Sequence, residues 1–235
     1  MRAAAPALAL IAIYAVATTV GPTSDTTVND LYVYSVYADL LRDGQLPFAD
    51  FGFEYPPLAI APIALGGGAW PLAVAMLACL LVAQWCCGRL AGPAAAWVVA
   101  ISPLLTGAMV RTHFDALPAA LAIGALLAFA RERPRLGFAL LAVGGMVKAW
   151  PLVLVPVAAA WLLGRGRRRA AWQGVALAAA ICALVLVPVA LLPGGADGLA
   201  DAVRFHQDRP VQIESTPASV LFAVGDSYVT GHPVR

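Results

Sequence analysis

Long apolar runs separated by short polar segments make up most of the 235-residue chain. A helix that crosses a bilayer needs about 20 predominantly apolar residues, or fewer if the span is short. Runs of roughly this kind occupy residues 3–20, 58–87, 94–110, 116–130, 136–163 and 171–192. The pattern predicts an all-α fold, a polytopic integral membrane helical bundle with about seven spans.

Two of these runs are interrupted by helix-breaking residues. Gly66 to Gly68 and Pro71 interrupt residues 58–87, which predicts either a short interfacial helix followed by one span or a broken helix. Pro151 interrupts residues 136–163. Basic segments flank this second run on both sides, so we expect two short helices that turn near Lys148.

The longest polar stretch, residues 21–57, holds one amphipathic segment. Residues 29–44 predict a helix with Asn29 as N-cap, Asp30 in the first turn and Gly44 at the end. Its apolar residues recur at helical spacing: Leu31, Tyr34, Ala38 and Leu41. Such a helix suits the membrane interface.

Composition supports a membrane protein and excludes several other classes. Hydrophobic residues form 61% of the chain and charged residues 12%, and the mean hydropathy is +0.82. Soluble domains are about half apolar and a quarter charged, and disordered chains are more polar still. The net charge of +2 gives no indication of a nucleic acid partner. The four cysteines lie in apolar runs, which favours buried apolar roles over disulfide or metal roles: Cys79, Cys86, Cys87 and Cys182.

The distribution of charge predicts an orientation, because Lys- and Arg-rich loops remain cytoplasmic. Residues 131–135 and 165–169 are the two clearest such loops. With a cytoplasmic N-terminus, residues 21–57 form the first outer loop and residues 193–235 an outer C-terminal segment. Every acidic residue except Glu132 then lies outside. An alternative interpretation of the first run is a signal peptide, because residues 15–17 resemble a cleavage site.

Ionisable residues from distant segments are expected to meet on the outer face. They come from the first outer loop, residues 111–115, Lys148 and residues 204–214. Cations can neutralise phosphate oxygens, and a carboxylate can accept a proton from an attacking hydroxyl. Structural alternatives remain open. Lys148 could extend to the lipid head groups, and residues 111–115 could form a self-contained polar network. Several acidic residues could simply lie on solvated helix faces, namely Asp39, Asp43, Asp197 and Asp201. Residues 54–57 could simply orient the following helix.

Several short motifs occur in a recognisable order. They are residues 30–34 (DLYVY), 44–51 (GQLPFADF), 53–57 (FEYPP), 113–115 (HFD), 148–151 (KAWP) and 206–215 (HQDRPVQIES). In this order the chain, from about Asp25 to Ser219, resembles bacterial glycosyltransferase family 87. Those proteins are GT-C fold enzymes, related in type to polyprenyl-phosphate-mannose-dependent mannosyltransferases of cell-envelope synthesis.

The resemblance implies an inverting transfer of a sugar, mannose or a related hexose or pentose, from a polyprenyl phosphate to a lipid or glycan acceptor. It places the reaction on the extracytoplasmic face of the bacterial plasma membrane. Asp30 is the expected general base and Asp25 the second choice. The cations expected at the donor phosphate are Lys148, Arg111 and Arg209, with His113 and His206 as hydrogen-bond donors. The residues expected at sugar or acceptor hydroxyls are Gln212, Glu214 and Asp115.

Some features depart from that family. The first outer loop has no Asp-x-Asp pair, so neither a metal nor another cofactor is expected. The chain is short for the family, and the last apolar segment, residues 217–224, is too short to span. We therefore expect one membrane domain over residues 1–235 that is incomplete at its C-terminus. Two alternatives remain open: a secondary transporter or lipid-carrier flippase, and an inactive fragment of such an enzyme.

Overall fold

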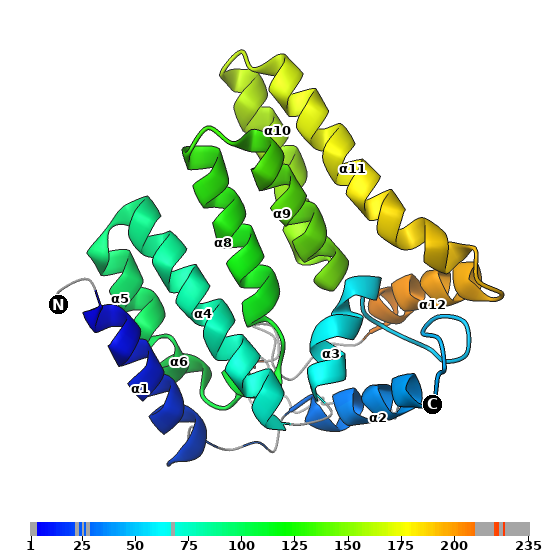
Figure 1. Cartoon of the computed structure of the whole chain (residues 1–235), viewed down its shortest axis with the longest axis horizontal. Helices are drawn as coiled ribbons and strands as arrows, with labels where there is room; N and C mark the ends of the chain where they lie inside the picture. The colour runs from blue at the N-terminus through cyan, green and yellow to red at the C-terminus, as the bar shows by residue number, and fades with distance from the viewer. Residues whose placement is uncertain are drawn as a thin grey trace.

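The computed structural model of the chain describes residues 4–21, 24, 26, 29–66, 69–209, 219–220 and 223. Within these residues, the regular secondary structure is helical apart from an isolated bridge between Pro47 and Phe51. Figure 1 shows the helices fanned out side by side. The all-α prediction is confirmed.

The helices pack side by side into one fan. On one side α1 (Ala5–Thr19) contacts α5 (Pro93–Ile101) and α6 (Pro103–Thr106), and α5 contacts α4 (Ala69–Ala91). Next to α4 lies α8 (Ala116–Ala130), followed by α9 (Pro134–Val147). The far side holds α10 (Leu154–Gly164) and α11 (Arg168–Ala190), which contact each other (Figure 1).

The helices expose apolar surface of the kind that lipid covers. Helices α4 and α11 are long and apolar enough to cross a membrane, and only 11% of the apolar stretch of α11 is buried. Large apolar side chains such as Leu105, Leu184 and Leu191 are at least three-quarters exposed. A soluble monomer rarely presents contiguous apolar surface on this scale. Further apolar helices have 10–17 residues each.

The interrupted runs divide into helices largely as predicted. Residues 58–87 form η2 (Pro57–Ala59), α3 (Ile60–Gly66) and then α4, which is the short helix followed by a span. Residues 136–163 form α9, η3 (Trp150–Val153) and α10, with an extended backbone at Lys148 between them. The two short helices predicted here are confirmed.

One run was predicted wrongly as continuous. Residues 94–110 contain α5, α6 and the start of α7 (Met109–Thr112) instead of a single helix. Gly107 has φ +56°, a left-handed backbone conformation that ends α6. Pro103 begins α6 because its missing N–H is not needed in a first helical turn.

The amphipathic segment forms α2 (Leu31–Arg42). Asp30 occupies the N-cap position, one residue later than predicted, while the Asn29 Oδ1 accepts a hydrogen bond from the Leu31 N–H at 2.9 Å. Tyr34, Tyr37 and Ala38 are buried against the rest of the fold. The buried face of the helix therefore places its N-cap residue, Asp30, next to the bundle.

A second amphipathic helix, α12 (Gly195–Gln207), packs against the segment before η2. A Cβ atom at Gly198 would lie 2.0 Å from the Phe48 carbonyl oxygen. No other residue permits the two backbones to approach this closely. The contact fixes α12 beside residues 48–54.

The interior has two apolar cores. An aromatic core lies under α2 and includes Tyr34, Tyr37, Phe53, Tyr55 and Phe114. Neighbouring rings in it lie 5.1–6.3 Å apart between centroids, in tilted and edge-to-face pairs. The other core lies between α8, α9, α10 and α11 and is mainly aliphatic.

The packing of α9 on α11 depends on a glycine. A Cβ atom at Gly174 would lie 2.0 Å from the ring of Phe138, which is fully buried. We expect Gly174→Ala to destabilise the fold by about 1–3 kcal/mol through overpacking. A lower midpoint of thermal unfolding in detergent measures this loss. Gly164→Ala is the matched control, because nothing lies within 4 Å of the added methyl group; equal midpoints for the two variants would contradict the expectation.

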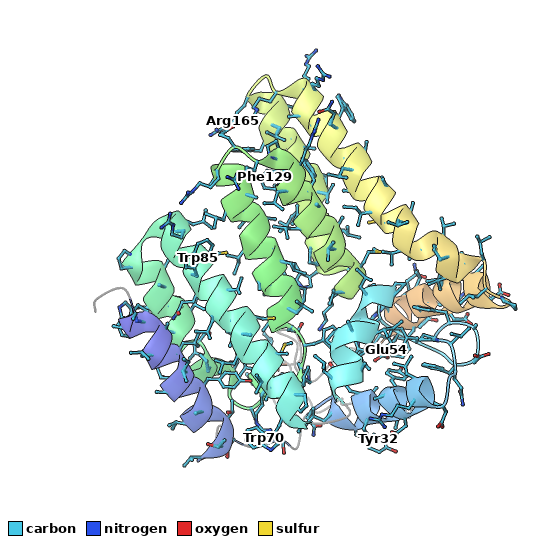
Figure 2. The ribbon with its side chains drawn as sticks, in the orientation of Figure 1. Tyr32, Glu54, Trp70, Trp85, Phe129 and Arg165 are labelled. Atoms are coloured by element: carbon cyan, nitrogen blue, oxygen red, sulfur yellow. The ribbon has the colours of Figure 1, made fainter. Side chains whose placement is uncertain are left out.

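The charged loops separate into two ends of the fan. Residues 131–135 join α8 to α9, and residues 165–169 join α10 to α11. Both loops lie at the same end of the fan as the last turn of α4, which contains Arg89 (Figures 1 and 2). An ion pair between Arg167 and Glu132 links the two loops. The opposite end carries α2, α3, α12 and the beginning of α8.

Candidate active site

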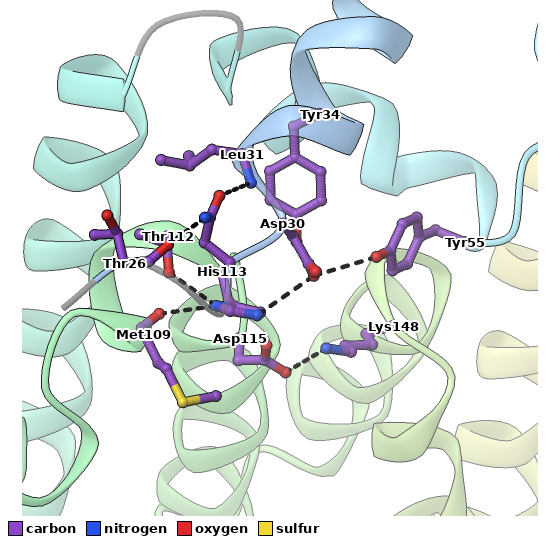
Figure 3. Close-up of polar contacts among 11 residues, drawn as sticks. Thr26, Asp30, Leu31, Tyr34, Tyr55, Met109, Thr112, His113, Asp115 and Lys148 are labelled. Atoms are coloured by element: carbon purple, nitrogen blue, oxygen red, sulfur yellow. Dashed lines mark hydrogen bonds and ion pairs between the residues drawn. The ribbon is translucent and has the colours of Figure 1, made fainter. Parts of the chain in front are cut away.

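Three side chains converge on one carboxylate oxygen of Asp30 (Figure 3). The Tyr34 hydroxyl donates to Asp30 Oδ2 at 3.0 Å and the Tyr55 hydroxyl at 3.4 Å. His113 Nε2 lies 3.6 Å from the same oxygen. Asp30 is nevertheless 33% exposed, so its carboxylate is held in one orientation and can still be reached from outside.

Three separate segments bring these groups together. Asp30 and Tyr34 are one turn apart at the start of α2, which places both on the same face of the helix. Tyr55 precedes η2, and His113 lies between α7 and α8. Phe114 fixes their relative positions, because its ring packs against Tyr34 at 5.4 Å and against Tyr55 at 5.1 Å.

The His113 ring is oriented from its other nitrogen. Nδ1 lies 3.0 Å from the Thr112 hydroxyl and 3.3 Å from the Met109 carbonyl oxygen. When the Thr112 hydroxyl donates to Nδ1, the ring hydrogen is on Nε2 and faces Asp30. In that tautomer the ring directs an N–H towards the carboxylate, across a distance of 3.6 Å that is longer than a hydrogen bond.

Lys148 lies beside this group and is paired with Asp115. Its Nζ is 2.5 Å from Asp115 Oδ1 (Figure 3). The same Nζ lies 5.4 Å from the centroid of the Phe114 ring. The side chain is 32% exposed. An ammonium group has three hydrogen-bond donors, of which Asp115 takes one. Lys148 therefore keeps donors for an anion while Asp115 holds it in place.

Burial keeps the two tyrosines in their hydroxyl forms. It raises the pKa of both Tyr34 and Tyr55 well above the usual range, and the nearby Asp30 carboxylate raises them further. Both side chains thus act as hydrogen-bond donors at any physiological pH.

Glu54 and the end of α12 border the same region. His206 Nε2 donates to the Glu54 carbonyl oxygen at 2.8 Å, and the Arg209 guanidinium lies 5.4 Å from the Phe205 ring centroid. Burial raises the pKa of the Glu54 carboxyl above its ordinary value; a hydrogen bond with Tyr55 and the charges of Arg209 and His206 oppose that rise.

The raised pKa of Glu54 predicts a pH-dependent effect on stability. Its protonated form is favoured in the folded state, so the wild type loses stability as pH rises through the folded pKa. Below pH 4.5, the ordinary pKa of a glutamate side chain, this loss of stability is absent. We expect Glu54→Gln to unfold at a higher temperature relative to wild type at pH 8 than at pH 4. A difference that stays constant between the two pH values would contradict this.

The other predicted site residues do not all lie near Asp30. The Arg111 Nε donates to the Thr18 carbonyl oxygen at 3.0 Å, at the end of α1. Asp25, Gln212 and Glu214 lie outside the described residues. Asp30, His113, Asp115 and Lys148 are the predicted residues that come together. Among the described residues, no three His, Cys, Asp or Glu side chains gather closely enough to hold a metal ion.

Tyr34 and Tyr55 were missed at the sequence level. Tyr34 was interpreted only as part of an apolar helix face, and Tyr55 as part of a turn that orients the next helix. The spacing of Asp30 and Tyr34, four residues apart in a helix, was the available signal. No comparable signal existed for Tyr55, which lies 25 residues from Asp30.

Comparison with known proteins identifies the family. The family model of glycosyltransferase family 87 matches residues 51–215, more than two thirds of the chain. The matched segment contains His113, Asp115 and Lys148, whereas Asp30 precedes it. No curated protein and no solved structure matches the chain significantly. The chain belongs to glycosyltransferase family 87, a family of GT-C glycosyltransferases.

Proposed function

We propose that the protein transfers a sugar, mannose or a related hexose or pentose, from a polyprenyl-phosphate donor to a hydroxyl of a cell-envelope acceptor. The observation that supports this most directly is the joint placement of Asp30 and Lys148. A carboxylate and a cation are linked through residues 113–115 at the end of the fan opposite the basic loops. Family membership supports the sugar transfer itself.

In the proposed reaction Asp30 is the general base. The acceptor oxygen attacks the anomeric carbon as its proton passes to the Asp30 carboxylate. The new carbon–oxygen bond forms on the face opposite the breaking bond to phosphate, so the configuration inverts. Tyr34, Tyr55 and His113 all engage Oδ2, and this arrangement favours Oδ1 as the oxygen that accepts the proton.

Lys148 stabilises the leaving polyprenyl phosphate. The phosphate gains negative charge as the bond to the sugar breaks, and a charge-assisted hydrogen bond from the ammonium offsets that charge. No proton has to be delivered, because a phosphate is a good leaving group.

We further propose seven spans, with the N-terminus cytoplasmic and Asp30 on the extracytoplasmic side. The long helices α4 and α11 and the shorter apolar helices supply the spans. The gathering of the arginine-rich loops at the opposite end supports this orientation. The apolar helices carry charged residues only near their ends, which favours an enzyme working at the membrane surface over a transporter with ionisable groups at mid-depth.

The direct test is sugar transfer by the purified chain in lipid nanodiscs. The donor is a mannosyl phosphate with a short radiolabelled polyprenyl chain, and candidate acceptors are supplied as a cell-envelope lipid extract. We expect release of polyprenyl phosphate together with a new glycosidic bond of inverted configuration, assigned by NMR. Absence of transfer from hexosyl and pentosyl donors alike would reject the proposal.

A further inference from the structure

An open groove separates residues 48–54 from α12. Its volume is about 430 Å³, within the range of small-molecule sites. One wall is the segment before η2, and the other is the face of α12 that includes Asp197, Asp201 and Phe205. The backbone contact between Gly198 and Phe48 fixes the floor of the groove, so the cavity exists before any ligand binds.

The groove is lined by carboxylates and aromatic rings. The carboxylates come from Asp50, Glu54, Asp197 and Asp201, and the partly exposed rings come from Phe51 and Phe205, whereas the rings of Phe48 and Phe53 are buried in the aromatic core. Among the described residues that line the groove, none is Lys, Arg or His. Asp201 pairs with Arg204 at 2.7 Å and Asp50 accepts the Leu46 N–H at 2.7 Å, whereas Asp197 is exposed on the α12 wall.

The groove lies one residue along the chain from a hydrogen-bond partner of the proposed general base. Glu54 belongs to its wall, and the next residue, Tyr55, donates its hydroxyl to Asp30. The positive charge of Lys148 acts on the separate, Asp115 side of Asp30. The Lys148 side of Asp30 is therefore cationic, whereas on the groove side four carboxylates outnumber the guanidinium groups of Arg204, which pairs with Asp201, and Arg209, which lies over Phe205.

We propose that this groove binds the acceptor, and that the bound part is an uncharged glycan. This inference rests on the proposed function. Carboxylates accept hydrogen bonds from sugar hydroxyls, and aromatic rings pack against the C–H face of a pyranose. The same carboxylates repel a phosphate or a uronic acid. The acidic wall thus selects a neutral glycan as acceptor and keeps the donor phosphate at Lys148.

The test compares two small probes that differ in one group: methyl glucoside, which is neutral, and methyl glucuronide, which carries a carboxylate. Neither has a lipid tail, so binding to the intact chain in nanodiscs can be followed by saturation-transfer NMR. We expect the wild type to bind the glucoside and to exclude the glucuronide. The variant Asp197→Asn/Asp201→Asn should bind the glucoside about tenfold more weakly, because hydrogen bonds to charged groups are lost, and should bind the glucuronide more tightly than wild type does.

Asp39→Asn is the matched control. Asp39 pairs with Arg42 three residues later on an exposed helix face, as Asp201 pairs with Arg204, but it lies outside the groove. We expect this variant to behave like wild type with both probes. If the double variant misfolds, Asp197→Asn alone tests the same expectation at an exposed carboxylate.

The outcomes separate this inference from the proposed function. If the groove variants bind both probes as wild type does, the groove inference is wrong, even if the protein transfers sugar from the polyprenyl phosphate. If the groove variants change probe binding as expected but wild type transfers no sugar, the glycan groove stands and the proposed transfer is wrong. A glucuronide that binds wild type as tightly as the glucoside also overturns the inference.

Discussion

Replacing Asp30 by Asn is expected to abolish almost all sugar transfer, lowering kcat by about 10²- to 10⁴-fold, the usual contribution of a general base. Asn has the same shape, but its amide does not take the proton of an attacking hydroxyl. It is also as good a helix N-cap residue as Asp, so α2 should remain folded. Donor binding, which depends on Lys148, should change little. The measurements are initial rates of transfer in nanodiscs and the affinity for the short-chain donor.

The control for Asp30→Asn is again Asp39→Asn, on the same helix but on its exposed face. It removes one carboxylate without touching the site, and transfer should remain at the wild-type rate. Tyr55→Phe adds a test of positioning, because it removes one hydrogen bond to Asp30 and leaves the carboxylate itself. We expect a partial loss of kcat there. Transfer by Asp30→Asn at more than a tenth of the wild-type rate would remove Asp30 as the base.

Replacing Lys148 by Met is expected to weaken donor binding by about 10- to 100-fold, the cost of one charge-assisted hydrogen bond, and to lower kcat further. Met retains most of the apolar stem, so its packing beside Phe114 is kept. The lost ammonium no longer neutralises phosphate in the ground state or the growing charge on the leaving group. The Lys148→Met variant therefore differs from Asp30→Asn, which should affect kcat alone.

A matched control for Lys148→Met is Arg42→Gln, which removes another cation that is paired with an aspartate on the same end of the fold. It should leave both donor affinity and kcat unchanged. Asp115→Asn is the informative second variant, because it keeps Lys148 but releases it from its partner. Unchanged donor affinity in Lys148→Met would show that the phosphate is held elsewhere.

The two short helices on either side of Lys148 could be predicted from local features alone. Pro151 breaks the run, and the basic segments at both of its ends require an even number of crossings. The run over residues 94–110 was predicted less well, because an apolar stretch does not reveal a turn. Gly107 ends α6 through a left-handed backbone conformation.

The site was predictable by its charge but not by its geometry. The polar exceptions in an apolar chain are few, so Asp30, His113, Asp115 and Lys148 stood out as candidates. Residue type alone could not show that Arg111 donates a hydrogen bond to the end of α1 while His113, two residues later, faces Asp30. A difference of about half a turn in a short, broken helix decides which side chain reaches the site.

Local apolar periodicity, prolines and charge were enough to predict the helical class, the positions of most helices and the separation of basic from acidic loops. The tertiary structure alone decided that Tyr34, Tyr55 and His113 share one oxygen of Asp30, and that α12 closes one wall of an acidic groove. Those contacts join segments far apart in the chain. They depend on how aromatic rings interlock and on how closely two backbones approach at Gly198, which only packing in three dimensions specifies.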